Sequence, residues 1–205
     1  MGRHTAAACK LCRREGEKLF LKGERCFSDK CAFSRRSYAP GHHGKVPVRT
    51  SEYLIRLREK QKARRIYGIG ERQFAKYFEI ASQKKGATGN KLLEFLERRL
   101  DNVVYRLGFA TSRQAGRQLV RHGNVLMNGH KLNVPSYEVR VNDEVQVVTK
   151  AAHLAKSALE KFPDRVTPAW LALTGEVAGK IVAIPKREDI DTSLEESLIV
   201  EYYSR

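Results

Sequence analysis

The spacing of apolar residues changes at Gly123, and this change constrains the fold more than any other feature of the chain. Before it, Arg113, Arg117 and Arg121 are spaced by four residues, which predicts a short helix with arginines along one face. After it, apolar and polar residues alternate around Asn128-Gly129, a strong signal for a hairpin turn. A helix pair followed by a small antiparallel sheet is therefore expected here.

The remaining elements follow from the same periodicities and their end signals. Gly116 lies beside the arginine row, where a missing side chain permits close approach of another backbone. Helices are expected at Glu52–Arg65 after an N-cap at Ser51, over Phe74–Ala81, along an apolar stripe from Leu93 to Leu107, at the segment that Ser112 caps, and at Ala151–Phe162. Strands are expected around Val125 and Met127, Leu132 and Val134, Val139 and Val141, and Val145 and Val147, and at Gly179–Ile184 and Leu198–Tyr202.

These elements predict an α+β fold in three parts. We expect an N-terminal zinc-bound segment over residues 1–45, a basic helical domain over 46–91, and a module of two helices packed on a small antiparallel sheet over 92–195. The tail at 196–205 is expected to pack on the helical domain. Hydrophobic residues make up 41% of the chain, as in a globular protein.

Net charge indicates the kind of partner. The chain carries +16, and residues 1–72 hold 19 Lys and Arg against 7 Asp and Glu. Such an excess favours a polyanion, which means RNA, DNA or an anionic membrane. The sequence has no apolar stretch long enough to span a membrane and no secretory signal at its start, so a cytoplasmic protein with no membrane partner is expected.

Four cysteines lie in one short polar segment, at Cys9, Cys12, Cys26 and Cys31. Two close pairs separated by a loop fit a tetrahedral Zn²⁺ site. An iron–sulfur cluster and unmetallated thiols are the alternatives, and His42 and His43 are possible substitute ligands. Four protein ligands leave no open position for a substrate, so the metal is expected to be structural.

The predicted helix Glu52–Arg65 is strongly basic in its second half. Glu59 is nearly the only acidic residue there, whereas a solvated helix usually mixes both signs. This composition favours a helix that faces phosphate groups. The aromatic residues of the next helix, Phe74, Tyr77 and Phe78, have core spacing and are interpreted as packing residues.

Residues 92–150 resemble a known small RNA-binding module. The run RLDNVVYRLGFATSRQAGRQLVRHGNVLMNGHKLNVPS contains its signature elements. These elements are Arg99, Asp101 and Arg106 on the first helix, Ser112-Arg113 at the start of the second, Gly123 at its end, and Val125-x-Met127-Asn128-Gly129 in the hairpin. The module also occurs in pseudouridine synthases, so it leaves the function open.

The rest of the chain resembles the family of bacterial small-subunit ribosomal protein four. The matching stretches are EKQKARRIYGIGERQFAKYF at Glu59–Phe78, the loop PGHHG and the end EYYSR. The four cysteines match the zinc-binding branch of this family. His42 is a departure, because the family usually has Gln there.

The resemblance implies a structural protein of the small ribosomal subunit with no enzymatic activity and no small-molecule substrate. Members of the family bind 16S rRNA early, nucleate assembly, adjoin ribosomal protein five at an interface linked to decoding accuracy, and lie beside the channel through which mRNA enters. Some repress their own mRNA.

We expect RNA binding through phosphate neutralisation and shape, because A-form RNA hides its base edges in a deep, narrow groove. Arginine suits this role, since its fork binds phosphate bidentately. The predicted contacts are Arg49, Arg56, Arg58, Lys62, Arg64, Arg65 and Arg72 in the helical region, and Arg106, Arg113, Arg117, Arg121, His122 and Lys131 in the module.

Two other functions are compatible with parts of the sequence. A pseudouridine synthase-like enzyme could carry the same module, but few residues follow Lys150 and no acid–base constellation stands out among them. A zinc-finger regulator of DNA would share the cysteines and the charge.

Overall fold

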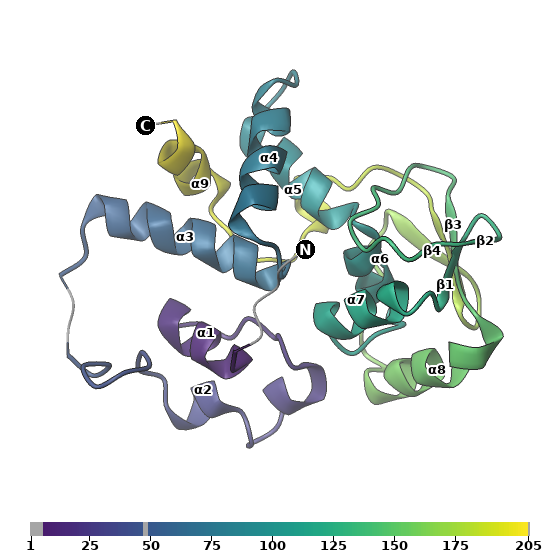
Figure 1. Ribbon diagram of the computed structural model, residues 1–205, viewed down its shortest axis with the longest axis horizontal. Helices are drawn as coiled ribbons and strands as arrows, with labels where there is room; N and C mark the ends of the chain where they lie inside the picture. Colours follow the sequence, from purple (N-terminus) through teal and green to yellow (C-terminus); the bar gives the residue numbers. More distant parts are fainter. Residues whose placement is uncertain (1–5, 47–48, 205) are drawn as a thin grey trace. The chain divides into compact units, whose positions relative to one another are not determined.

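The chain folds into two compact units, described here from a computed structural model that covers residues 6–46 and 49–204 (Figure 1). Unit 1 comprises Met1–Leu92 together with Thr192–Arg205, and unit 2 comprises Leu93–Asp191. The division into three domains stays a prediction. None of the described helices is long and apolar enough to cross a membrane.

Unit 1 is helical. Its elements are α1 (Ala8–Glu15), the 3₁₀ turn η1 (Gly23–Cys26), α2 (Ala32–Arg35), α3 (Glu52–Ile66), α4 (Glu71–Ser82) and α9 (Glu196–Tyr203), while α5 (Thr88–Glu97) spans the point of division. The Ser51 hydroxyl accepts a hydrogen bond from the Leu54 N–H at 3.3 Å, which confirms the predicted N-cap of α3. Phe74, Ala81 and Ile199 are fully buried, so α4 and α9 both contribute to the core.

Two expectations for unit 1 are wrong. Leu198–Tyr202 is not a strand but part of α9, which packs along α3. Helical spacing places Ile199 and Tyr203 on one face of α9 and so lets both reach the helical core. A short β-turn around Gly23 is the expectation for the segment between the cysteine pairs, which instead contains the 3₁₀ turn η1.

Unit 2 is a helix pair with an antiparallel sheet. Helices α6 (Leu100–Arg106) and α7 (Arg113–Arg121) pack together. The strands are β1 (Val125–Met127), β2 (His130–Lys131), β3 (Glu144–Val147), β4 (Leu171–Gly175) and β5 (Ala178–Ile181), in the order β2-β1-β3-β5-β4. The 3₁₀ turn η2 (Thr149–Ala151) and helix α8 (Ala152–Lys161) connect β3 with β4, and η3 (Arg187–Asp189) follows β5.

The core of unit 2 follows the period-two pattern of its strands. Val125 pairs with Val147 and Met127 with Val145, and all four side chains are buried. Asn128 and Gly129 have φ values of 50° and 81°, as a tight hairpin turn requires. The mixed α+β fold, the Ser112 cap of α7 and this hairpin are therefore confirmed.

The apolar stripe from Leu93 to Leu107 is not one helix. Helix α5 ends at Glu97 and α6 begins at Leu100, so Arg99 lies outside both and forms a bridge with Glu138. Val139 and Val141 precede β3 rather than forming part of it. Strand β4 was missed by the sequence analysis.

Candidate nucleic-acid interface

Three predicted contact residues lie exposed at one end of α7 and in the adjoining hairpin. Arg121 closes α7, His122 follows it and Lys131 lies in β2. A side-chain carbon added at Gly123 would lie 2.6 Å from Lys131 Cε, so Lys131 passes directly over the end of the helix. Among the described residues none of the three has an acidic partner, which leaves the charges of Arg121 and Lys131 available to an external anion.

The other two arginines of the α7 row are mostly buried. Arg117 Nη1 lies 3.0 Å from Asp101 Oδ2, and Arg113 Nε donates to Asn102 Oδ1 at 2.7 Å. Each side chain is 12% exposed. The row shares one face as predicted, but Arg121 alone of the three is exposed.

Arg106 is placed in the interior of unit 2. Its guanidinium forms two hydrogen bonds of 2.9 Å with Glu97 and a third of 2.6 Å with Asp191. Arg99 is bonded to Asp101 in a similar fork, at 3.0 and 2.7 Å. Arg106 therefore ties α6 to neighbouring carboxylates and could meet RNA only if those partners moved.

The predicted contacts of α3 are paired with acids, contrary to the expectation of a helix without counter-charges. Glu52 and Glu59 belong to α3 itself and Glu71 follows it closely, whereas Glu15, Glu17 and Glu201 come from distant positions that local reading of the helix could not reveal. Arg56 bonds Glu201 at 2.6 Å and Glu52 at 3.1 Å, Arg58 lies 3.5 Å from Glu15, Lys62 lies 3.1 Å from both Glu17 and Glu59, Arg64 lies 3.1 Å from Glu71, and Arg65 pairs with Glu15.

Glu15 is the most enclosed of these acids, with its side chain only 1% exposed. Burial raises the pKa of Glu15, although Arg65 and Arg58 act to lower it. A buried carboxylate needs such cationic partners, so Arg58 and Arg65 have a structural role as well as a predicted one in binding. Arg49 and Arg72, in contrast, are exposed and have no acidic partner within the described ranges.

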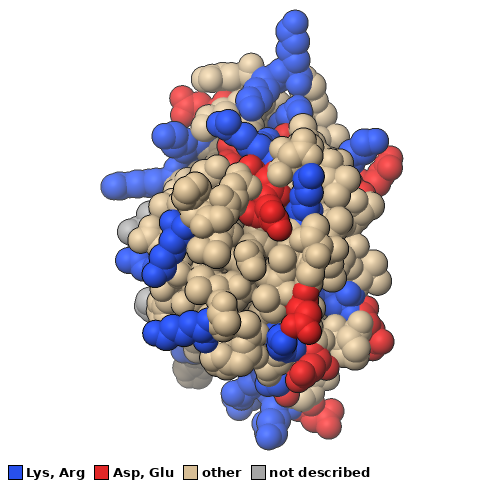
Figure 2. Space-filling model, turned by 90° about the vertical axis from the view of Figure 1, so that its right-hand side faces the viewer, with Lys and Arg blue, Asp and Glu red and all other residues tan. Residues whose placement is uncertain are grey.

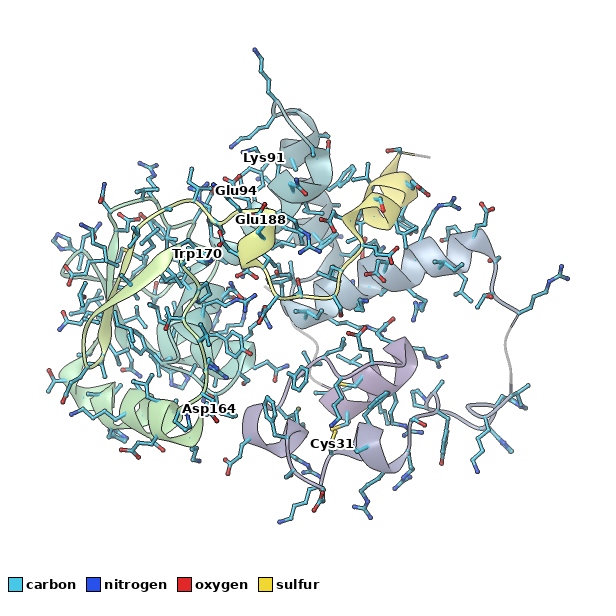
Figure 3. The ribbon with its side chains drawn as sticks, turned by 180° about the vertical axis from the view of Figure 1, so that it is seen from behind. Cys31, Lys91, Glu94, Asp164, Trp170 and Glu188 are labelled. Atoms are coloured by element: carbon cyan, nitrogen blue, oxygen red, sulfur yellow. The ribbon has the colours of Figure 1, made fainter. Side chains whose placement is uncertain are left out.

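The cysteine segment does not show a formed metal site. Within residues 6–46 and 49–204, no three or more His, Cys, Asp or Glu side chains are arranged to hold a metal ion. The cysteines are nevertheless all free thiols, and Cys12, Cys26 and Cys31 are buried. Figure 3 shows Cys31 near α1, the helix that carries Cys9 and Cys12.

Backbone amides surround the sulfur atoms in this segment. The Lys22 N–H donates to Cys26 Sγ at 3.4 Å. Burial acts to raise the pKa of Cys31, but hydrogen bonds from the backbone N–H groups of Ser34 and Phe33 bring it below the usual value. Amide donors of this kind favour thiolates. His42 and His43 stack on each other with ring centroids 5.2 Å apart and are exposed.

Sequence reasoning missed Arg165, which lies in the connection between α8 and β4. It carries no local signal, because it belongs to no periodic pattern and follows a proline-marked loop. In the structure its guanidinium packs against Tyr105, whose ring also contacts Arg113.

The basic residues do not form one continuous patch on every face. On the side shown in Figure 2, Lys and Arg groups are separated by uncharged surface and by acidic residues.

A helix pair packed on a hairpin sheet, with exposed cations where the second helix meets the hairpin, defines a class of small RNA-binding modules. Two family models match the chain: "Ribosomal protein S4/S9 N-terminal domain" over residues 3–97 and "S4 domain" over residues 98–145. The match to the N-terminal domain comes first along the chain, and the match to the RNA-binding module follows it.

Curated relatives match along the whole chain. The small ribosomal subunit protein uS4 of Dictyoglomus thermophilum is 54% identical over 206 residues and that of Desulforamulus reducens is 56% identical over 208 residues, with all of each chain covered. The uS4 protein of Geobacter sp. strain M21 is 54% identical over the same full extent. The chain belongs to the uS4 family of small ribosomal subunit proteins, a structural family and not one of enzymes.

Proposed function

We propose that the chain is a structural component of the small ribosomal subunit in the cytoplasm and binds 16S rRNA through phosphate contacts. One observation carries the proposal: Arg121, His122 and Lys131 stand together and exposed, without acidic partners among the described residues, in the module that the family model matches. Full-length similarity to ribosomal relatives supports the choice of RNA.

Salt dependence of binding tests this proposal. Each phosphate neutralised by a cation contributes about 0.9 to the slope of log K against log salt for a duplex, and about 0.7 for a single strand. Replacing Arg121 and Lys131 together by Ala should lower the slope by about two units and weaken binding to 16S rRNA. Lys156→Ala, which removes an exposed cation already paired with Glu176 at 2.6 Å, should change the slope much less.

A competition experiment between nucleic acids distinguishes rRNA binding from the function of a DNA regulator. The protein should prefer 16S rRNA to duplex DNA at matched salt, whereas a DNA regulator would not. Formation of pseudouridine in rRNA incubated with the pure protein would instead support an RNA-modifying enzyme.

We further propose the finer roles that the resemblance implies. These are early binding that nucleates assembly of the subunit body, contact with ribosomal protein five, a contribution to translational accuracy, and a position beside the channel through which mRNA enters. Crosslinking of the assembled subunit, with sites mapped by mass spectrometry, should join this chain to protein five and to mRNA. Crosslinks to neither would contradict these placements.

We also propose that Cys9, Cys12, Cys26 and Cys31 bind one structural Zn²⁺. The proposal is supported by the donor set: four free thiols in one segment, three of them buried, with backbone amides donating to sulfur. Bound zinc would stabilise a segment too short to build a core of its own.

Native mass spectrometry of the full chain tests the metal. The mass of one zinc ion should be present and should disappear when all four cysteines are replaced by Ser. Visible absorption from an iron–sulfur cluster would identify the alternative cofactor, and a metal-free mass with full stability would contradict both.

A further inference from the structure

Arg165 is a partly buried cation held only by uncharged groups. It follows Asp164 in the connection after α8 (Figure 3). Its Nη1 donates to the backbone carbonyl of Ala110 at 2.9 Å and to that of Tyr105 at 3.2 Å. Its Cζ lies 4.5 Å from the Tyr105 ring centroid and 4.8 Å from that of Phe162. No carboxylate among the described residues forms an ion pair with it.

The positive charges near Arg165 make the partial burial of its guanidinium energetically unfavourable. Arg113 lies 4.7 Å from the same Tyr105 ring, and Asp191, whose charge acts on Arg165, is bonded to Arg106. Burial lowers the pKa of the Arg165 guanidinium, and the charges of Arg113 and Arg106 lower it further. A guanidinium nevertheless stays protonated in proteins, so this partly buried one, which is bonded to carbonyls and packed on rings but forms no ion pair, would be stabilised by an external anion.

A cavity adjoins the guanidinium. It has a volume of about 240 Å³ and is lined in part by Arg106, Phe162, Pro163, Arg165 and Thr167. Arg165 uses Nη1 for its two carbonyl bonds, which leaves the remaining N–H donors of its fork for a ligand. Thr167 lines the same cavity together with apolar side chains, and its hydroxyl is a possible further donor. The Arg106 guanidinium is already bonded to Glu97 and Asp191, so the fork of Arg165 is the group that suits an anion with several acceptor oxygens here.

We propose that Arg165 and Thr167 form a phosphate site that takes one phosphate group of the bound RNA as the counter-ion of Arg165. The inference rests on the proposed RNA-binding function, and it adds a contact outside the module that the family model matches, which ends at residue 145. Because Arg165 shares the Tyr105 ring with Arg113, this phosphate would lie close to the buried end of the α7 arginine row.

Inorganic phosphate tests the site without RNA. At constant ionic strength, replacing chloride by phosphate should raise the thermal unfolding temperature of the full chain. Arg165→Gln, which removes the charge but keeps an amide donor, should reduce this difference to the general stabilisation that phosphate gives any folded protein. Lys156→Gln is the matched control, because it removes one exposed cation from the same unit, and it should keep the difference. Equal stabilisation of Arg165→Gln and the wild type would overturn the proposal.

A chemical measurement avoids dependence on the folding of the variant. In the wild-type protein, phosphate should slow modification of Arg165 by phenylglyoxal several-fold relative to chloride, with the site mapped by mass spectrometry. Exposed Arg140 should react at the same rate in both salts. An unchanged rate at Arg165 would also overturn the proposal.

Binding to 16S rRNA then distinguishes the source of the phosphate. Arg165→Gln should weaken binding about tenfold and lower the salt slope by about one unit. If phosphate protects Arg165 but Arg165→Gln binds RNA with an unchanged slope, the site takes free phosphate and the RNA assignment is wrong. If the wild type shows no preference for 16S rRNA, the proposed function fails while the anion site stands.

Discussion

The Tyr203 hydroxyl donates a hydrogen bond of 2.9 Å to the Glu71 carboxylate, which joins α9 to α4. The same Glu71 oxygen accepts a 2.8 Å hydrogen bond from Lys60 Nζ, and this ammonium also lies 4.4 Å from the Tyr202 ring centroid. Lys60 is buried, with only 3% of its surface exposed. The end of the chain is thus part of the core of unit 1 and satisfies a buried cation there.

Removal of the Tyr203 hydroxyl should therefore destabilise unit 1. Tyr203→Phe is expected to cost about 1 kcal/mol of unfolding free energy, the usual net value of such a hydrogen bond. Urea unfolding would measure it. The cost should shrink in a Glu71→Ala background, where the acceptor is already absent, and an equal cost in both backgrounds would show that the hydroxyl acts elsewhere.

Glu71 should also give unit 1 a specific acid sensitivity. Burial alone would raise its pKa, but hydrogen bonds from Lys60 and Tyr203 bring it below the usual value of about 4.3. A carboxyl whose pKa is lower in the folded state contributes stability that is complete above the unfolded-state pKa and is lost as pH falls through the folded-state pKa. Urea midpoints between pH 7 and pH 3 should fall less steeply in Glu71→Gln, and superimposable pH profiles would refute this role.

Gly116 should tolerate no side chain. Its position confirms the expected close approach, because an added Cβ would lie 2.7 Å from the backbone oxygen of Asp101 in α6. Gly116→Ala must push α6 and α7 apart and should cost about 1–3 kcal/mol, as overpacking usually does. The exposed position Gln114 on the same helix provides the control, since Gln114→Ala should leave the unfolding free energy nearly unchanged.

Arg117 and Arg121 should differ in what their removal changes. Arg121→Ala is expected to lower the salt slope for 16S rRNA by about one unit and to leave stability unchanged, because Arg121 is exposed. Arg117→Ala should weaken RNA binding as well, but it also removes one of the two arginine partners of the buried Asp101, the other being Arg99, and should cost about 1–3 kcal/mol of stability. Thermal unfolding and filter binding of both variants would separate the effect on stability from the effect on RNA binding. Identical behaviour of the two variants would contradict the difference in burial between Arg117 and Arg121.

The parts of the fold that were predicted correctly are those determined by residues close together in the sequence. The Ser51 and Ser112 caps, the turn at Asn128-Gly129 and the alternation of Val145 and Val147 depend on residues a few positions apart, and all are present. Leu198–Tyr202 was predicted as a strand because its composition favours one. Its helical state depends on contacts with α3 and α4, which no local window contains.

The candidate site was harder to predict, because the acidic partners of its basic residues are brought to them only by folding. The exposure of Arg121, His122 and Lys131 agrees with what composition and spacing indicated. The pairing of α3 with Glu15 and Glu201 did not follow from its own sequence, since these acids lie far from it along the chain. Arg165 was missed for the same reason, because its neighbours Tyr105 and Ala110 are brought to it only by folding.

The division of unit 1 into two stretches of chain has a consequence for biosynthesis. Residues 93–191 are continuous, so unit 2 can fold as soon as they have left the translating ribosome. Unit 1 must wait for α9, and until then Lys60 and Glu71 lack Tyr203 and the core lacks Ile199. The module that presents Arg121 and Lys131 should thus mature before the helices that precede it in the sequence, and a nascent chain should be able to engage RNA before its first-made half is complete.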